Sequence, residues 1–462
     1  MALEKHVGSL GPPTVHLQQQ QQFPYPDSCY GDSDNLSDVC DVTAPSSSSG
    51  FWSGGFATSD VSLKERAALN ASCLVVDEND DNDSDWGEEE WPVGRPLPLP
   101  EWGCERPEVR FVSLAHYHKF IWSATEHLKA DLASQPYDAV SNFIWFGREY
   151  QKNRGEYPNL REFYRDYDPP MVSGHFTCVG LSAHLASRLA DLEKDYPGLK
   201  DAMYQVSCEE ELTQEEIEMH SELREPVTSQ CLIEHVMLCI RMRVNDRHGV
   251  ILFDPGYHLG HPITVMEDGA FPQSGVVLGN SANDNIKKFF SYNFLPHNNA
   301  FVVWNVREIR SGVVHKEYSS LIHVTRPFLS GLDVSERRSI LFKLKSLICR
   351  DGSGKLSCGL YMFLRNFTDT NVTFFYESNG AKKHYKKALS YFLNERPDQR
   401  GTNWRYMDEE IETALQKIAM GTGINLKELR YMLVCVAELA QDEKFLREIN
   451  EFEDDMTETF EN

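Results

Sequence analysis

Three residues of this chain, Cys178, His235 and Asp254, are of the types that together carry out nucleophilic catalysis by a thiol. In such a set the imidazole takes the proton from the thiol, and the carboxylate fixes the tautomer of the imidazole. Cys178 stands near the start of a predicted amphipathic helix over 176–193, capped by Thr177, where the positive end of the helix dipole favours a thiolate. The ordinary alternative is a cysteine buried in the core. Its place at the helix start makes Cys178 the candidate nucleophile.

The histidine and the aspartate fall on two neighbouring predicted strands. His235 lies at the beginning of a segment of period two, 234–244, and Asp254 ends the return strand, 250–254. With a two-residue turn at 245–246, the register puts the two side chains on one face, diagonal to each other and about 7–8 Å apart between backbones. A four-residue loop keeps them on one face, whereas a three- or five-residue loop separates them. The spacing therefore permits a His–Asp pair.

This order of cysteine, histidine and aspartate resembles the transglutaminase-like branch of the papain-like cysteine fold. The hairpin H-V-M-L followed by V-I-L-F-D-P-G-Y is similar to the arylamine N-acetyltransferase pattern of a histidine, an alternating strand, a turn and D-x-G-[FY]. The resemblance covers 171–257 closely and extends loosely to about 364, where that family continues into a β-barrel domain. It implies Cys178 as the acyl-accepting nucleophile, His235 as the base and Asp254 as the orienter, with acyl-CoA as a co-substrate that such an enzyme could use.

The composition limits the classes of partner. The 462 residues include 70 acidic and 45 basic side chains, a net charge of −25, which disfavours binding to nucleic acid or to anionic lipid. No apolar run approaches the roughly 20 residues that span a bilayer. The beginning of the chain has no signal-peptide pattern, and the cysteines are expected to be reduced thiols. We therefore expect a cytoplasmic protein, with the nucleus as a second compartment, and no cofactor or metal.

The predicted fold is α+β, in three parts. Residues 1–105 are acidic and of low complexity, and we expect a disordered tail that either solubilises the chain or binds a protein partner. Residues 106–365 are expected to form the papain-like cysteine domain with a β-rich extension, and 366–462 a mostly helical region. The segment 209–225 is predicted to be a surface loop or short helix. His175 either lines the cleft or faces solvent.

The leading functional hypothesis is a thiol-dependent acyltransferase or amide hydrolase that acts on a small-molecule or peptide acyl substrate through a thioester on Cys178. The only oxyanion donor that the sequence offers is the backbone N–H of Cys178. The alternative is a catalytically inactive papain-like fold that binds proteins through the acidic tail and the C-terminal helices. The absence of Arg-Gly-Gly before Cys178, and of a glutamine at the papain oxyanion spacing, favours that alternative.

Overall fold

The computed structural model describes residues 91–92, 94–227, 231–257, 259–279, 286–394 and 407–461. Most of the predicted tail, 1–105, lies outside this part of the chain. Its last residues are packed, however, because Leu97 is buried and the Gly103 N–H donates to the Pro327 carbonyl at 2.8 Å. Residues just before the predicted boundary at 105 are therefore packed against the rest of the described chain.

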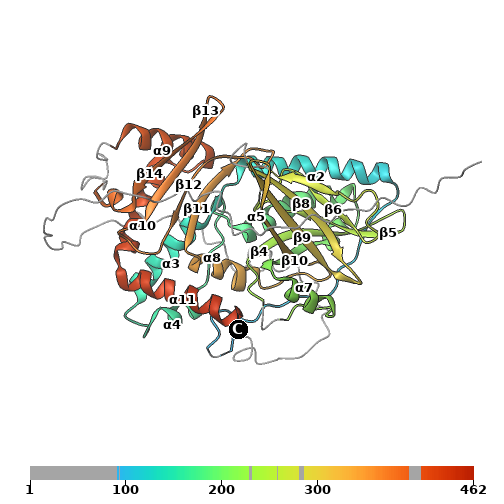
Figure 1. Ribbon diagram of the computed structural model, residues 1–462, viewed down its shortest axis with the longest axis horizontal. Helices are drawn as coiled ribbons and strands as arrows, with labels where there is room; N and C mark the ends of the chain where they lie inside the picture. Colours follow the sequence, from blue (N-terminus) through green and yellow to red (C-terminus); the bar gives the residue numbers. More distant parts are fainter. Residues whose placement is uncertain are drawn as a thin grey trace, which may run out of the picture.

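In the described part of the chain, two sheets are surrounded by helices, which confirms a mixed α and β fold (Figure 1). The α-helices are α2 (Leu114–Ser134), α3 (Ala139–Asn153), α4 (Leu160–Asp166), α5 (Cys178–Leu189), α6 (Leu199–Ala202), α7 (Gln214–Ser221), α8 (Arg337–Leu341), α9 (Glu409–Thr422), α10 (Leu426–Gln441) and α11 (Glu443–Glu461). Shorter helical turns are η2 (Ala190–Lys194), η3 (Gly331–Glu336) and η4 (Leu389–Asn394). None of these helices is long and apolar enough to cross a membrane.

The larger sheet holds the strand that begins with the candidate His235 and the strand that ends just before the candidate Asp254. Its order is β6-β5-β4-β3-β10-β9-β8-β7, all antiparallel, with β1 added parallel to β4. The bounds are β1 (Val109–Phe111), β3 (Met203–Leu212), β4 (His235–Val244), β5 (Arg247–Phe253), β6 (Ile263–Met266), β7 (Val276–Gly279), β8 (Ile286–Leu295), β9 (Asn298–Arg310) and β10 (Val313–His323). Apolar side chains of α2 and α5 pack with those of β4 and β5 in one core cluster. The sheet curls, so that the Gln273 side chain joins Met266 of β6 to Tyr292 of β8.

The acidic segment 209–225 corrects the sequence prediction. Its first residues belong to β3, in the middle of the larger sheet, and only then does α7 begin. Glu209 is buried, and burial raises its pKa to about 8. Its carboxylate accepts hydrogen bonds from the backbone N–H groups of Leu232 and Ile233, at 2.6 and 2.9 Å. The strand forms here because distant backbone donors satisfy an acidic side chain that the sequence alone assigns to the surface.

The smaller sheet has the order β14-β13-β12-β11-β2. Its strands are β2 (Tyr137–Asp138), β11 (Leu344–Arg350), β12 (Leu356–Phe363), β13 (Asn371–Ser378) and β14 (Ala381–Ala388). The turn predicted at Asp351 joins β11 and β12, as expected. The region 366–462 is therefore not helical from its start: it begins with the β13–β14 hairpin, which continues the β11–β12 sheet.

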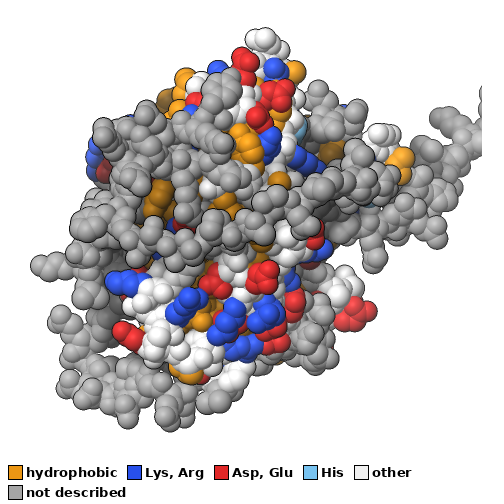
Figure 2. All heavy atoms as spheres, turned by 90° about the vertical axis from the view of Figure 1, so that its left-hand side faces the viewer, with side chains coloured by type: hydrophobic (Ala, Val, Ile, Leu, Met, Phe, Trp, Pro, Cys, Tyr) orange, Lys and Arg blue, Asp and Glu red, His pale blue; other side chains and the backbone are white. Residues whose placement is uncertain are grey.

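The C-terminal helices share a core with the residues before them. Phe445 of α11 packs against Phe143 and Phe146 of α3, and the same cluster includes residues of β11, β12 and β13. Ion pairs also join α3 to the end of α10, including Arg154 with Asp442 at 2.8 Å. Figure 2 shows one face of the molecule, on which basic and acidic side chains of the described residues are interspersed. Residues on both sides of the predicted boundary at 365 therefore share one core cluster.

Candidate functional site

Cys178 is the first residue of α5, as the sequence predicts. Thr177 occupies the N-cap position, but its side chain makes no capping hydrogen bond. Instead, the Thr177 hydroxyl donates to the buried carboxylate of Glu336. The predicted capping hydrogen bond is therefore wrong, because the Thr177 hydroxyl is bonded to Glu336 and not to the helix end. Cys178 is largely buried, with 7% of its surface exposed.

His235 and Asp254 are brought together by the β4–β5 hairpin. Asn245 and Asp246 form the two-residue turn, with φ of 48° and 60°, the left-handed conformation that a tight hairpin of this kind requires. Val244 pairs with Arg247, so the register expected for a two-residue turn is confirmed. At the other end of the hairpin, His235 Nε2 lies 3.1 Å from Asp254 Oδ1, and both side chains are buried.

The three candidate residues meet around Gly256. A Cβ placed on Gly256 would lie 3.1 Å from the Cys178 Cβ, 3.1 Å from the His235 Cε1 and 3.4 Å from the Asp254 Oδ1. The Cys178 Cβ and the His235 Cε1 are therefore separated by at most twice 3.1 Å. Because Nε2 of the imidazole faces Asp254, Nδ1 is left for the thiol, which matches the roles of base and orienter.

The electrostatic surroundings favour a charged imidazole. Burial lowers the pKa of His235, but the Asp254 carboxylate and the Cys178 sulfur, both hydrogen-bonded to the ring, outweigh burial and raise the pKa well above its ordinary value. The Gly256 N–H also donates to Asp254 Oδ1, at 3.2 Å, and helps to hold the carboxylate in place. An imidazole held in this way can accept a proton from the thiol and keep it.

Arg350 is a contributor to the site that the sequence did not indicate. This buried arginine ends β11, and its guanidinium donates to the Pro255 carbonyl at 2.7 Å and to the Gly256 carbonyl at 2.6 Å. It thereby clamps the turn that follows Asp254. Nothing in the sequence points to this contact, because 94 residues separate Arg350 from Gly256 and no motif links them.

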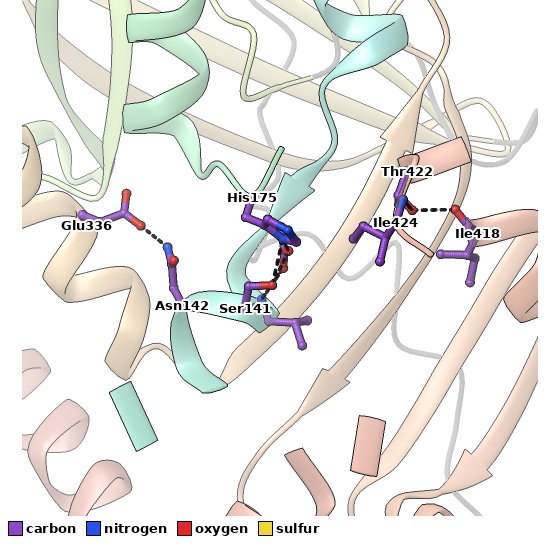
Figure 3. Close-up of polar contacts among 9 residues, drawn as sticks. Ser141, Asn142, His175, Glu336, Ile418, Thr422 and Ile424 are labelled. Atoms are coloured by element: carbon purple, nitrogen blue, oxygen red, sulfur yellow. Dashed lines mark hydrogen bonds and ion pairs between the residues drawn. The ribbon is translucent and has the colours of Figure 1, made fainter. Parts of the chain in front are cut away.

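A buried polar network lies next to the start of α5, around Glu336. Figure 3 shows the Asn142 amide directed at the Glu336 carboxylate, to which it donates, so Glu336 accepts from both Asn142 and Thr177. Burial raises the pKa of Glu336 to about 7, against the hydrogen bond from Thr177, which lowers it. Glu336, on η3, is therefore a carboxyl group that changes charge near neutral pH and contacts Thr177, the residue before the candidate nucleophile. The sequence predicted no role for it.

His175 neither reaches Cys178 nor stands free in solvent. Its Nδ1 lies 2.7 Å from Asp138 Oδ2 and 3.0 Å from the Ser141 hydroxyl, beside which Figure 3 shows the ring. Asp138 caps α3 through the backbone N–H groups of Val140 and Ser141. Burial lowers the pKa of His175, but Asp138 outweighs it and raises the pKa. His175 thus anchors the segment before Cys178 to the beginning of α3.

Tyr137 is a second residue near the thiol that sequence reasoning missed. It forms a bridge with Phe176, two residues before Cys178. Burial raises the pKa of the Tyr137 phenol well above its ordinary value, and the charges of Cys178 and Glu336 raise it further. The phenol therefore remains a neutral O–H donor close to the candidate nucleophile.

Neither a protein-family model nor a curated protein sequence matches the chain. A solved structure that it resembles is the arylamine N-acetyltransferase from Mycobacterium abscessus, with 9% sequence identity over 67% of this chain and 88% of that one, and a TM-score of 0.34. At this TM-score the likeness is a distant resemblance of fold.

Proposed function

We propose that this chain is a thiol-dependent acyltransferase or amide hydrolase on a papain-like fold, with Cys178 as nucleophile, His235 as base and Asp254 as orienter. The observation that carries the proposal is the convergence of the three side chains on Gly256, from the start of a helix and from two neighbouring strands. Three residues from separate elements that meet in this order provide a nucleophile, a proton acceptor and a group that fixes the acceptor.

The proposed reaction is ping-pong. His235 takes the proton from the Cys178 thiol, and the thiolate adds to the carbonyl carbon of the acyl donor. The tetrahedral intermediate collapses as His235 returns the proton to the leaving group, which leaves a thioester on Cys178. An acceptor amine or water, deprotonated by His235, then attacks the thioester and restores the thiol. A small-molecule or peptide acyl group, or an acyl-CoA, would serve as donor.

We expect two groups to donate a hydrogen bond to the oxyanion of the tetrahedral intermediate. One is the Cys178 N–H, at the beginning of α5, where backbone donors point outward from the helix. The other is the Tyr137 phenol, which interacts electrostatically with Cys178 and whose backbone forms a bridge with Phe176.

A catalytically inactive protein-binding module is the second candidate. It is favoured by Gln205 of β3, whose amide donates to the Val179 carbonyl and the Ser182 hydroxyl, at 2.9 and 2.7 Å, and so is engaged within α5 rather than offered to an oxyanion. In that case the acidic tail and the C-terminal helices would bind a protein partner, and Cys178 would be an ordinary core thiol.

Limiting iodoacetamide, followed by peptide mapping, separates the two functions. Cys104 is exposed and serves as an internal reference for an unactivated thiol. The enzyme proposal expects the largely buried Cys178 to react faster than Cys104, and the His235→Gln variant to lose that advantage. Incubation with a small thioester should also give an acyl adduct that is absent from Cys178→Ser. Labelling of Cys104 ahead of Cys178, with no adduct, would leave the protein-binding module.

A further inference from the structure

Two cysteines of the smaller sheet face each other directly. Cys349 on β11 pairs with Cys358 on β12, and both are free, buried thiols. The α carbons of directly opposed residues on antiparallel strands lie about 4.5–5.5 Å apart. Disulfides close over α-carbon distances of about 4.4–6.8 Å. The backbone therefore already holds this pair at a distance that a disulfide needs.

The two sulfur atoms also lie together, against the end of α9. A Cβ placed on Gly421 would be 2.5 Å from the Cys358 Sγ and 3.2 Å from the Cys349 Sγ, so both sulfurs occupy the space that this glycine leaves. The Cys358 thiol donates to the Lys417 carbonyl at 3.6 Å. The Cys349 thiol is hydrogen-bonded in turn to the Cys358 sulfur. Both sulfurs thus face the same helix and touch each other.

The hydrogen bond between the thiols makes them unequal. As the acceptor, Cys358 has its pKa lowered by the Cys349 thiol, although burial acts in the opposite direction. As the donor, Cys349 has its pKa raised by that bond and by burial. Since the thiolate is the reactive form, the order of attack to be tested begins at Cys358.

We propose that Cys349 and Cys358 form a redox-active dithiol, which a hydroperoxide converts into a cross-strand disulfide. The Cys358 thiolate attacks the distal peroxide oxygen, the O–O bond breaks, and the leaving oxygen departs as water or an alcohol after taking a proton. The resulting sulfenic acid is attacked by the Cys349 sulfur, so the S–S bond forms, the S–O bond breaks and water leaves. In all, two thiols and one hydrogen peroxide give one disulfide and two waters.

The location connects the dithiol to the loop after Asp254. Cys349 precedes Arg350, whose guanidinium clamps Pro255 and Gly256, and the β11–β12 register shifts between these two residues. Bulges of this kind bend a strand locally and re-aim its side chains. The proposal itself concerns only the two thiols and does not depend on any activity of Cys178.

The full chain, carrying Cys178→Ser to remove the other candidate reactive thiol, should be treated with one equivalent of hydrogen peroxide and mapped without reduction. The expected product is a peptide pair linked through Cys349 and Cys358, with the loss of two hydrogen atoms. A dithiol-specific trivalent arsenical should bind before the treatment and not after it. The proposal is overturned if both cysteines remain free while the exposed Cys104 is oxidised, or if either pairs with another cysteine.

Single variants test the order of the two steps. Cys349→Ser should trap a sulfenic acid on Cys358 that reacts with dimedone, whereas Cys358→Ser should leave Cys349 unreacted at the same peroxide dose. Cys435→Ser, which removes a buried thiol of α10, is the matched control and should leave the disulfide unchanged. Equal dimedone labelling in the two single variants would contradict the assigned order.

Discussion

The guanidinium of Arg350 donates to the carbonyl oxygen of Gly256 at 2.6 Å and so joins the smaller sheet to the loop that follows Asp254. His235 begins β4 and Asp254 directly follows β5, and both strands belong to the larger sheet. The proposed site therefore depends on both sheets: one provides the His–Asp pair, and the other fixes the turn against which that pair and Cys178 meet.

Replacing Arg350 with methionine should slow acylation of Cys178 and destabilise the protein. The buried Pro255 carbonyl and the half-buried Gly256 carbonyl would each lose a donor, at a cost of about 1–3 kcal/mol for the buried one. Because the loop would be held less firmly, kcat for a thioester probe should fall while KM changes little. The kcat of Arg350→Lys, whose side chain has one donor group in place of a fork, should lie between those of the wild type and Arg350→Met. Urea unfolding gives the stability and steady-state kinetics give the rates.

The control for that variant is Arg241→Met. Arg241 is a partly buried arginine that also donates to a backbone carbonyl, that of Arg106 at 2.7 Å, away from the site. The Arg241→Met protein should be less stable than the wild type, without a selective loss of kcat. An Arg350→Met protein that is folded and acylates at the normal rate would show that Arg350 has only a structural role.

Replacing Gly256 with alanine should slow the alkylation of Cys178 while the protein stays folded. The added methyl would lie 3.1 Å from both the Cys178 Cβ and the His235 Cε1, closer than ordinary van der Waals contact, so these neighbours must shift by a few tenths of an ångström. A misplacement of about 1 Å costs on the order of a hundredfold in rate, so the loss for this smaller shift should stay below that bound. The alkylation rate of Cys178 measures the loss.

Gly155→Ala is the matched control, because no atom lies within 4 Å of the Cβ that it would add. Its circular dichroism, unfolding midpoint and Cys178 reactivity should equal those of the unmodified chain. Normal alkylation of Cys178 in Gly256→Ala would mean that the three side chains do not work as a unit.

The sequence permitted the His–Asp pair, because the pairing depends on local rules. A strand alternates its faces with period two, so once the turn has two residues, Asn245 and Asp246, parity fixes which residues share a face. The helix that begins at Cys178 follows in the same way from its apolar stripe.

Contacts across long stretches of chain could not be predicted. Glu209 is charged and the sequence therefore assigns it to the surface, yet backbone donors 23 and 24 residues later satisfy it inside the sheet. The strand β14 has four lysines and no apolar alternation, so the sequence pattern does not predict a strand there, and only the pairing with β13 defines it. The charges on an edge strand oppose aggregation and do not prevent such pairing.

The raised pKa of His235 predicts a component of stability that is present in acid and lost at high pH. The folded state binds the imidazole proton more tightly than the unfolded chain, whose histidine has a pKa of about 6.5. The contribution is therefore complete below that pH and disappears as the pH rises through the folded pKa. His235→Gln should remove it, so the difference in unfolding free energy between the two proteins should shrink with rising pH. A pH-independent difference would contradict a charged imidazole at this position.

The buried carboxyl of Glu336 should make stability fall between roughly pH 4.5 and 7. Burial raises its pKa to about 7, so the folded state holds a proton that the unfolded chain releases at a lower pH. The sign is again a loss of stability as pH rises through the folded pKa, on the order of 3 kcal/mol in all.

Glu336→Gln keeps an oxygen to accept from Thr177 but cannot ionise, so urea titrations should show a flatter profile in this window. Glu443→Gln, an exposed carboxyl on α11, is the control and should retain the wild-type slope. Equal slopes in Glu336→Gln and the wild type would show that Glu336 is already ionised at pH 5.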